Sequence, residues 1–229
     1  MQKVRFYTTI LLMTLCFQSI IMAEAPKFSA NIFKNGTLVY SDDFDGAYNK
    51  KWWGGNRKDR KIEDGKLIIF PRFKTKDEAM KVLKRDHHLG LDPTVHLNKI
   101  PEKFVCHLRF KYVTDTDKKT GPVLQIGHHM ISLAYLDGGG HSIAVPKGPR
   151  FTDKKSNMKI NEWIDLIIEY ELGKILISVN GHSKTIENKA VTIINPKDKH
   201  GPRFSFKHRI ASPKSQIVFD YVRLWSVEE

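Results

Sequence analysis

Cysteine is nearly absent from the chain. Only Cys16 and Cys106 occur among its 229 residues. Cys16 lies in an apolar N-terminal stretch that we expect to be removed, which leaves Cys106 without an intrachain disulfide partner. For an exported domain, this lack of disulfides is more typical of a bacterial periplasm or cell surface than of a eukaryotic secretory route.

Long apolar runs are absent after the N-terminal stretch. Residues 1–25, "MQKVRFYTTILLMTLCFQSIIMAEA", combine a basic start, an apolar centre and small residues at Ala23 and Ala25. This pattern predicts a secretory signal peptide, cleaved after Ala23 because Pro26 disfavours cleavage after Ala25. A single membrane anchor is the alternative, since the run is near the lower limit for a span. The predicted layout is a signal peptide at 1–23, an N-terminal extension at 24–37 and one domain at 38–229.

Acidic residues are scarce beside basic ones. The 38 Lys and Arg exceed the 25 Asp and Glu by 13, and loss of Lys3 and Arg5 with the signal peptide leaves +11. This charge attracts anionic partners such as acidic or sulfated polysaccharides or lipid headgroups. The lysines are dispersed and show no nucleic-acid motif, so we expect no nucleic-acid partner. A solvated lysine-rich surface is the alternative reading. We expect no transmembrane segment after cleavage, and the sequence does not indicate an oligomeric state.

Internal repeats and low-complexity linkers are also missing, and alternation of apolar and polar residues dominates. This period of two predicts many short strands separated by turns. We therefore expect an all-β antiparallel sandwich or jelly roll of two curved sheets. Only Thr75–Asp86 suggests a helical turn or two. The clearest predicted strands are Gly65–Phe70, Phe104–Val113, Trp163–Leu172, Lys174–Gly181, Arg203–His208 and Ser215–Trp225.

The strongest local pattern is a hairpin in "NEWIDLIIEYELGKILISVNGHSKTI". Its strands meet at a tight Leu172–Gly173 turn, and Asn180–Gly181 suits a second turn that needs positive φ. We expect Trp163 and Trp225 to lie in the core.

Three motifs together resemble concanavalin A-like lectin/glucanase (laminin-G-like) jelly rolls. They are the opening "LVYSDDFDG…WW" with "IEDGKLII", the central hairpin ending in "NG", and the closing "IVFDYVRLW". Within this fold the chain looks most like exported bacterial domains related to the 3-keto-disaccharide hydrolase group. The resemblance spans about Leu38 to Val227 and implies that the first and last strands pair. It also implies a polysaccharide or glycan partner, while the activity stays open because the fold serves lectins, hydrolases, lyases and inert modules.

A glucanase carboxylate motif is absent. Glycosidases need two carboxylates on one face, and jelly-roll glucanases place theirs in an E-x-D-x-(x)-E strand. The nearest set is Glu162, Asp165, Glu169 and Glu171. We interpret it as an exposed polar strand face.

Histidine is abundant, with ten residues, and three lie in "QIGHHMISLAYLDGGGHSIAV". A hairpin closed at Asp137–Gly140 would place Leu136 opposite His141. His128 and His141 would then be roughly 23 Å apart, at about 3.3 Å per residue. In a strand, His128 and His129 would also face opposite sides. We therefore expect these histidines not to form one site.

The family resemblance implies other candidates. It points to His87 or His88, together with His141, as a catalytic acid or base or as metal ligands. Arg85 could bind a carboxylate or sulfate, and Asp86 could orient His88. There is no HExxH motif and no Cys/His cluster, so neither a metal nor a cofactor is assigned. Polar residues at a strand end are the alternative.

Aromatic residues offer stacking surfaces for sugars. Trp52 and Trp53, in "WWGGNR", and Tyr135, beside "LDGGG", are the candidates, with Arg57 and Arg85 as basic contacts. Three function classes remain: a glycan-binding module, a 3-keto-disaccharide hydrolase-like enzyme, and a structural or adhesion domain without a small ligand.

Overall fold

The computed structural model describes residues 26–54, 57–84, 91–116, 122–197, 199, 201–209 and 212–228. The predicted signal peptide lies outside these residues and stays a prediction. In the described ranges, no helix has the length and apolar character needed to cross a membrane.

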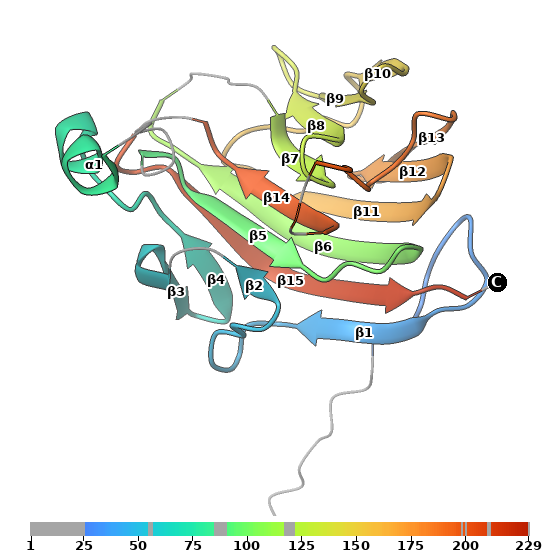
Figure 1. The fold of residues 1–229 in the computed structure, drawn as a ribbon, viewed down its shortest axis with the longest axis horizontal. Helices are drawn as coiled ribbons and strands as arrows, with labels where there is room; N and C mark the ends of the chain where they lie inside the picture. Colours follow the sequence, from blue (N-terminus) through green and yellow to red (C-terminus); the bar gives the residue numbers. More distant parts are fainter. Residues whose placement is uncertain are drawn as a thin grey trace, which may run out of the picture.

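The chain forms two stacked antiparallel sheets (Figure 1), which confirms the predicted all-β sandwich. The eight-stranded sheet, sheet A, has the order β13-β12-β11-β6-β15-β4-β3, and β1 also pairs with β15. The seven-stranded sheet, sheet B, has the order β10-β9-β8-β7-β14-β5-β2. Pairing of β1 with β15 is the predicted contact between the first and last strands.

The six strands predicted above are all present. The bounds in sheet A are β1 Thr37–Asp42, β3 Arg60–Glu63, β4 Lys66–Ile69, β6 Phe104–Val113, β11 Ile164–Glu171, β12 Lys174–Val179, β13 His182–Glu187 and β15 Gln216–Ser226. Those in sheet B are β2 Trp53–Gly54, β5 Thr94–Asn98, β7 Pro122–Ile126, β8 Ile131–Tyr135, β9 His141–Ala144, β10 Arg150–Asp153 and β14 Arg203–Lys207.

Among the described residues, two helices lie outside the sheets: η1 at Arg57–Asp59 and α1 at Lys76–Leu83. Helix α1 falls within the predicted helical stretch and lies at the left of Figure 1. It begins after Thr75, whose hydroxyl accepts a hydrogen bond from the Glu78 amide, as N-cap residues do.

Phenylalanine rings fill the space between the sheets. Phe206 of sheet B lies 4.8 Å from Phe219 and 5.6 Å from Phe110, both of sheet A, measured between ring centroids. All three are fully buried, because alternate residues of each strand point inward. The prediction that Trp163 joins this core is wrong: Trp163 precedes β11 and shares the outward direction of Asp165.

The predicted turns of the central hairpin are confirmed. Glu171 pairs with Lys174 around Leu172–Gly173, where Gly173 has φ 85°. Val179 pairs with His182 around Asn180–Gly181, with φ of 51° and 82°. Two consecutive positive φ values are what a type I′ hairpin turn requires.

The N-terminal segment, residues 26–36, covers part of the outer face of sheet A. It forms the blue loop beside the C-terminus in Figure 1. Glu169 is 0% exposed beneath it and accepts hydrogen bonds from Asn31 N (2.7 Å), Asn31 Nδ2 (2.9 Å) and Ile32 N (2.6 Å). The prediction of an exposed face is therefore wrong for Glu169. Trp225 is buried, as expected, but it lies beneath this segment with Phe28 against it instead of between the sheets.

We expect Glu169→Ala to lower the free energy of unfolding by about 2–3 kcal/mol, because three hydrogen-bond donors lose their buried charged acceptor. Urea denaturation measures this loss, and limited proteolysis should show faster cleavage within residues 26–36. Glu171→Ala is the matched control. It removes only a partly exposed ion pair with Lys103 and should cost below about 1 kcal/mol. Equal effects of the two variants would contradict the role of Glu169.

Candidate functional site

The β8–β9 hairpin exists, but its register differs by one residue from the prediction. Tyr135, and not Leu136, lies opposite His141. The loop is one residue longer than expected because it begins at Leu136. It ends at Gly140, with φ 95°, where a Cβ atom would lie 2.4 Å from the Asp153 carbonyl oxygen. This register gives Tyr135 the inward direction of Leu133.

His141 lies inside the sandwich. It is 0% exposed, and its Nδ1 is 2.7 Å from Ser156 Oγ. Its Nε2 has no hydrogen-bond partner among the described residues, and burial lowers its pKa. An enclosed imidazole does not contact a glycan on the surface. Its predicted partners His87 and His88, with Arg85 and Asp86, lie outside the described residues, so their role stays a prediction.

His128 and His129 lie together in the turn between β7 and β8. Their ring centroids are 4.1 Å apart, and both line one hollow. The prediction that they face opposite sides is wrong, because they belong to a turn in which His129 has φ 62°. His128 precedes β8 and His141 follows it, so the two are separated by that strand, as expected.

The predicted aromatic platform is mostly internal. Trp53 is 2% exposed, and its Nε1 donates a hydrogen bond to Tyr40 Oη at 2.8 Å. Trp52 is partly buried and stacks on Tyr40, with ring centroids 4.6 Å apart. Trp53 therefore belongs to the core and presents no face to a sugar. Arg57 begins η1, and its side chain is outside the described part.

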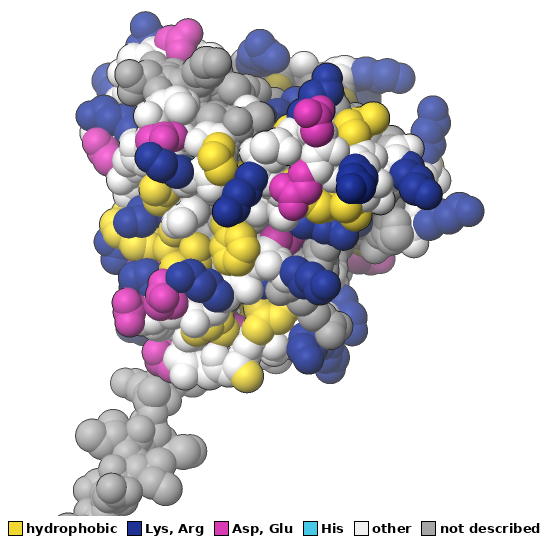
Figure 2. Space-filling view, turned by 90° about the vertical axis from the view of Figure 1, so that its left-hand side faces the viewer, with side chains coloured by type: hydrophobic (Ala, Val, Ile, Leu, Met, Phe, Trp, Pro, Cys, Tyr) yellow, Lys and Arg dark blue, Asp and Glu magenta, His cyan; other side chains and the backbone are white. Residues whose placement is uncertain are grey.

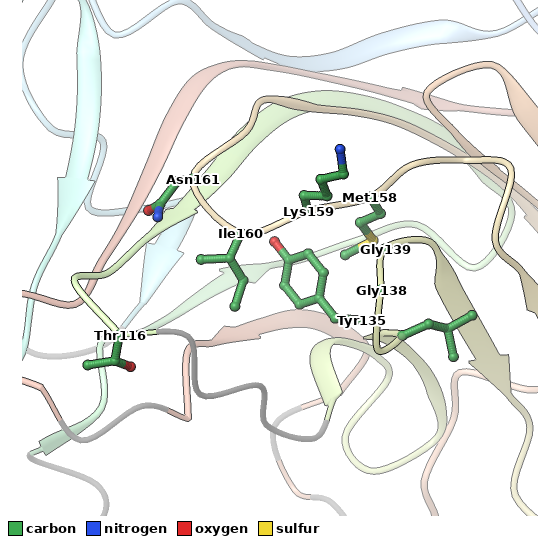
Figure 3. Close-up of a pocket in the computed structure, with 9 residues that line it drawn as sticks. Thr116, Tyr135, Gly138, Gly139, Met158, Lys159, Ile160 and Asn161 are labelled. Carbon is green, nitrogen blue, oxygen red and sulfur yellow. The ribbon is translucent and has the colours of Figure 1, made fainter.

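Tyr135 lines a pocket of about 320 Å³ between the β8–β9 loop and residues 158–161. Figure 3 shows its ring among the side chains of Met158, Lys159 and Ile160. Tyr135 Oη and Thr116 Oγ1 are buried without a hydrogen-bond partner in the described structure. Burial raises the pKa of Tyr135, so this phenol stays protonated. The pocket can hold a small, mostly apolar group.

The outer face of sheet B is built from small and polar side chains. Cross-strand pairing aligns one residue from each of its seven strands into a straight line, which we call the outer row. Because directly paired residues share a face, the whole row points away from the core. Its members, in strand order, are Gly54, His96, Ser205, Gln125, Ser132, Ala144 and Arg150.

Two hollows on this face share His96 and Arg203, and their volumes are about 430 and 310 Å³. We call them together the basic groove. His96 Nδ1 lies 3.1 Å from Ser205 Oγ, and Lys207 Nζ lies 3.5 Å from Asp92. None of the described residues that line either hollow is Asp or Glu. The basic residues of the groove are His96, Lys99, His128, His129, Arg203, Lys207 and Arg209.

The charged side chains on the face shown in Figure 2 are more dispersed than those of the basic groove. Figure 2 shows a face on which Lys and Arg side chains stand apart from one another, with fewer Asp and Glu between them. Sequence reasoning missed His96, Arg203 and Lys207. A signal was present, since these residues alternate with the buried Leu97, Phe204 and Phe206 and must therefore point outward.

Solved structures share this architecture at low sequence identity. An endo-acting O-glycanase from a study of human gut microbiota and mucin breakdown matches at 11% identity, with a TM-score of 0.54, and covers 84% of this chain and 100% of its own. A non-specific endo-β-1,3(4)-glucanase from family GH16 matches at 14% identity and TM-score 0.51, with 84% and 91% covered. The Bacillus licheniformis β-glucanase matches at 10% identity and TM-score 0.52, with 85% and 100% covered.

The chain has the concanavalin A-like jelly-roll fold. Sequence identities of 10–14% show a shared fold and do not show a shared activity. No protein-family model matches the jelly roll, and a search of curated proteins finds no match. The more specific resemblance to the 3-keto-disaccharide hydrolase group stays a prediction.

Glycosidase chemistry uses two carboxylates on one face. In the described strands β5, β7, β8, β9 and β14, the outward positions carry no Asp or Glu. These strand positions therefore do not supply an acid and a nucleophile or base for hydrolysis by that mechanism.

A second buried imidazole makes stability depend on pH. His208 is 1% exposed and lies against the Tyr112 ring, and burial lowers its pKa to about 4. The unfolded chain binds this proton near pH 6.5, so the stabilisation is complete above that pH and is lost as the pH falls toward 4. A shift of this size corresponds to about 3 kcal/mol.

We expect His208→Phe to flatten the dependence of unfolding free energy on pH between 6.5 and 4, because a neutral ring removes the titration. Urea denaturation across this range measures the slope. An unchanged slope in the variant would show that His208 does not titrate as described.

Proposed function

We propose that the protein is an exported bacterial carbohydrate-binding protein that holds an acidic or sulfated polysaccharide along the basic groove of sheet B. The observation that carries this proposal is the groove itself, which combines lysines, arginines and imidazoles with no carboxylate among its described lining residues. Such a surface attracts anions and lacks the acid pair that hydrolysis needs.

The shape of the outer face of sheet B also suits an extended polysaccharide. Ser132 and Ala144 have short side chains, so a polymer can approach the backbone closely at these positions of the outer row. Gln125 and Ser205 supply neutral hydrogen-bonding groups between the charged ones. Placed polar groups of this kind orient a bound ligand.

Two further observations support the proposal. The structural neighbours named above are a glycanase and two glucanases, so proteins with this fold act on glycans. The predicted signal peptide would bring the chain to the compartment where polysaccharides occur.

We expect Arg203→Gln with Arg209→Gln to weaken binding to a heparin column at least tenfold, because two groove cations are lost. Retention of the unchanged protein should also fall as salt rises, since salt screens such charges. Lys50→Gln with Lys51→Gln is the matched control: it removes the same charge from an exposed turn and should change retention little. An equal loss of heparin binding in both double variants would contradict the assignment of the binding site to the basic groove.

An enzyme of the 3-keto-disaccharide hydrolase type is the second candidate. It is favoured by the imidazoles of the groove, because a histidine near neutral pH can act as a general acid or base. If this candidate holds, the unchanged protein turns over an oxidised disaccharide and His96→Gln abolishes that turnover at unchanged melting temperature. A pure binding protein releases no new sugar ends, which end-group analysis would reveal.

A further inference from the structure

Trp163 lies on the outer face of sheet A, beyond the part that the N-terminal segment covers. Three cations surround its indole: Lys111 Nζ at 4.6 Å, Arg109 Cζ at 5.2 Å and Lys66 Nζ at 5.6 Å from the ring centroid. We call these four residues the Trp163 patch. Cations are attracted to the face of an aromatic ring, which explains why they gather despite their mutual repulsion.

A β-bulge shapes the neighbouring strand. The register of β15 against β6 shifts between Phe219 and Tyr221. Phe219 stays buried in the core, while Asp220 and Tyr221 are both partly exposed. A bulge re-aims side chains in this way, and here it directs Tyr221 to the outer face.

The nearby carboxylates are engaged elsewhere or shared. Asp165 lies 3.0 Å from His107 Nε2 through one oxygen and accepts a hydrogen bond from Tyr221 at 3.1 Å through the other. Asp220 is shared by Lys66 at 2.7 Å and Arg109 at 3.3 Å. Asp220 thus pairs with two of the three cations, and the pKa of Asp165 is lowered first by its hydrogen bond with His107 and also by Arg109. Lys111 forms no ion pair with a carboxylate in the described part of the chain, so the patch carries excess positive charge.

The cations remain accessible. The side chains of Arg109 and Lys66 are 42% and 36% exposed. A guanidinium binds a sulfate or carboxylate through two parallel hydrogen bonds, and an ammonium adds a further donor. The indole supplies an apolar surface of the kind on which the C–H face of a sugar ring stacks.

We propose that the Trp163 patch is a second binding site, specific for anionic saccharides, on the face opposite the basic groove. Arg109 and Lys111 bind the sulfate or carboxylate group, and Trp163 contacts the sugar ring. The site is independent of the groove. Together the two faces can bind two segments of polysaccharide and increase avidity.

The test uses intrinsic tryptophan fluorescence of the full chain, titrated with a heparin tetrasaccharide. We expect saturable quenching by this probe and none by neutral cellotetraose. The other three indoles should respond little, because Trp53 and Trp225 are buried and Trp52 stacks on Tyr40. Trp163→Phe should abolish the response, and Lys111→Gln should weaken the affinity at least fivefold, both at unchanged melting temperature.

Several outcomes would overturn the proposal. They are an absent response in the unchanged protein, quenching that survives Trp163→Phe, and an equal response to cellotetraose. Equal affinity for inorganic sulfate would show an anion site that does not recognise the saccharide.

The groove variant Arg203→Gln with Arg209→Gln separates the two proposals. It should keep the fluorescence response while its binding to the heparin column weakens. If it loses the fluorescence response, the groove accounts for all binding and the second site fails.

Discussion

Phe206 of sheet B packs against Phe110 and Phe219 of sheet A. The basic groove and the Trp163 patch both depend on this contact. In a strand, a residue that points into the core fixes its neighbours outward. Burial of Phe204 and Phe206 therefore sends Arg203, Ser205 and Lys207 to the groove. Burial of Phe110 likewise sends Arg109 and Lys111 to the opposite face.

Alternation explains why most of the fold was predictable. Strands such as Phe104–Val113 bury every second side chain, and this leaves a period of two that can be read without coordinates. Positive-φ pairs such as Asn180–Gly181 mark hairpin turns because few other residues tolerate that conformation.

The features that were not predictable break local periodicity or arise from distant contacts. The bulge before Tyr221 changes which face a residue occupies, and no local pattern marks it. The burial of Glu169 depends on a segment far away in the sequence. The adjacent His128 and His129 do line the groove, but the sequence alone did not reveal His96 and Arg203, which reach it only through the pairing of β5 with β14.

The outer row has a consequence for which ligands the protein can distinguish. It crosses seven strands, and with strands about 4.8 Å apart it extends over about 29 Å. A ligand that contacts the whole row must be linear and lie at right angles to the strands. A short fragment engages only part of that length and dissociates sooner. Under the proposed function, the sheet would therefore bind intact polysaccharide more tightly than the small sugars released when it is degraded.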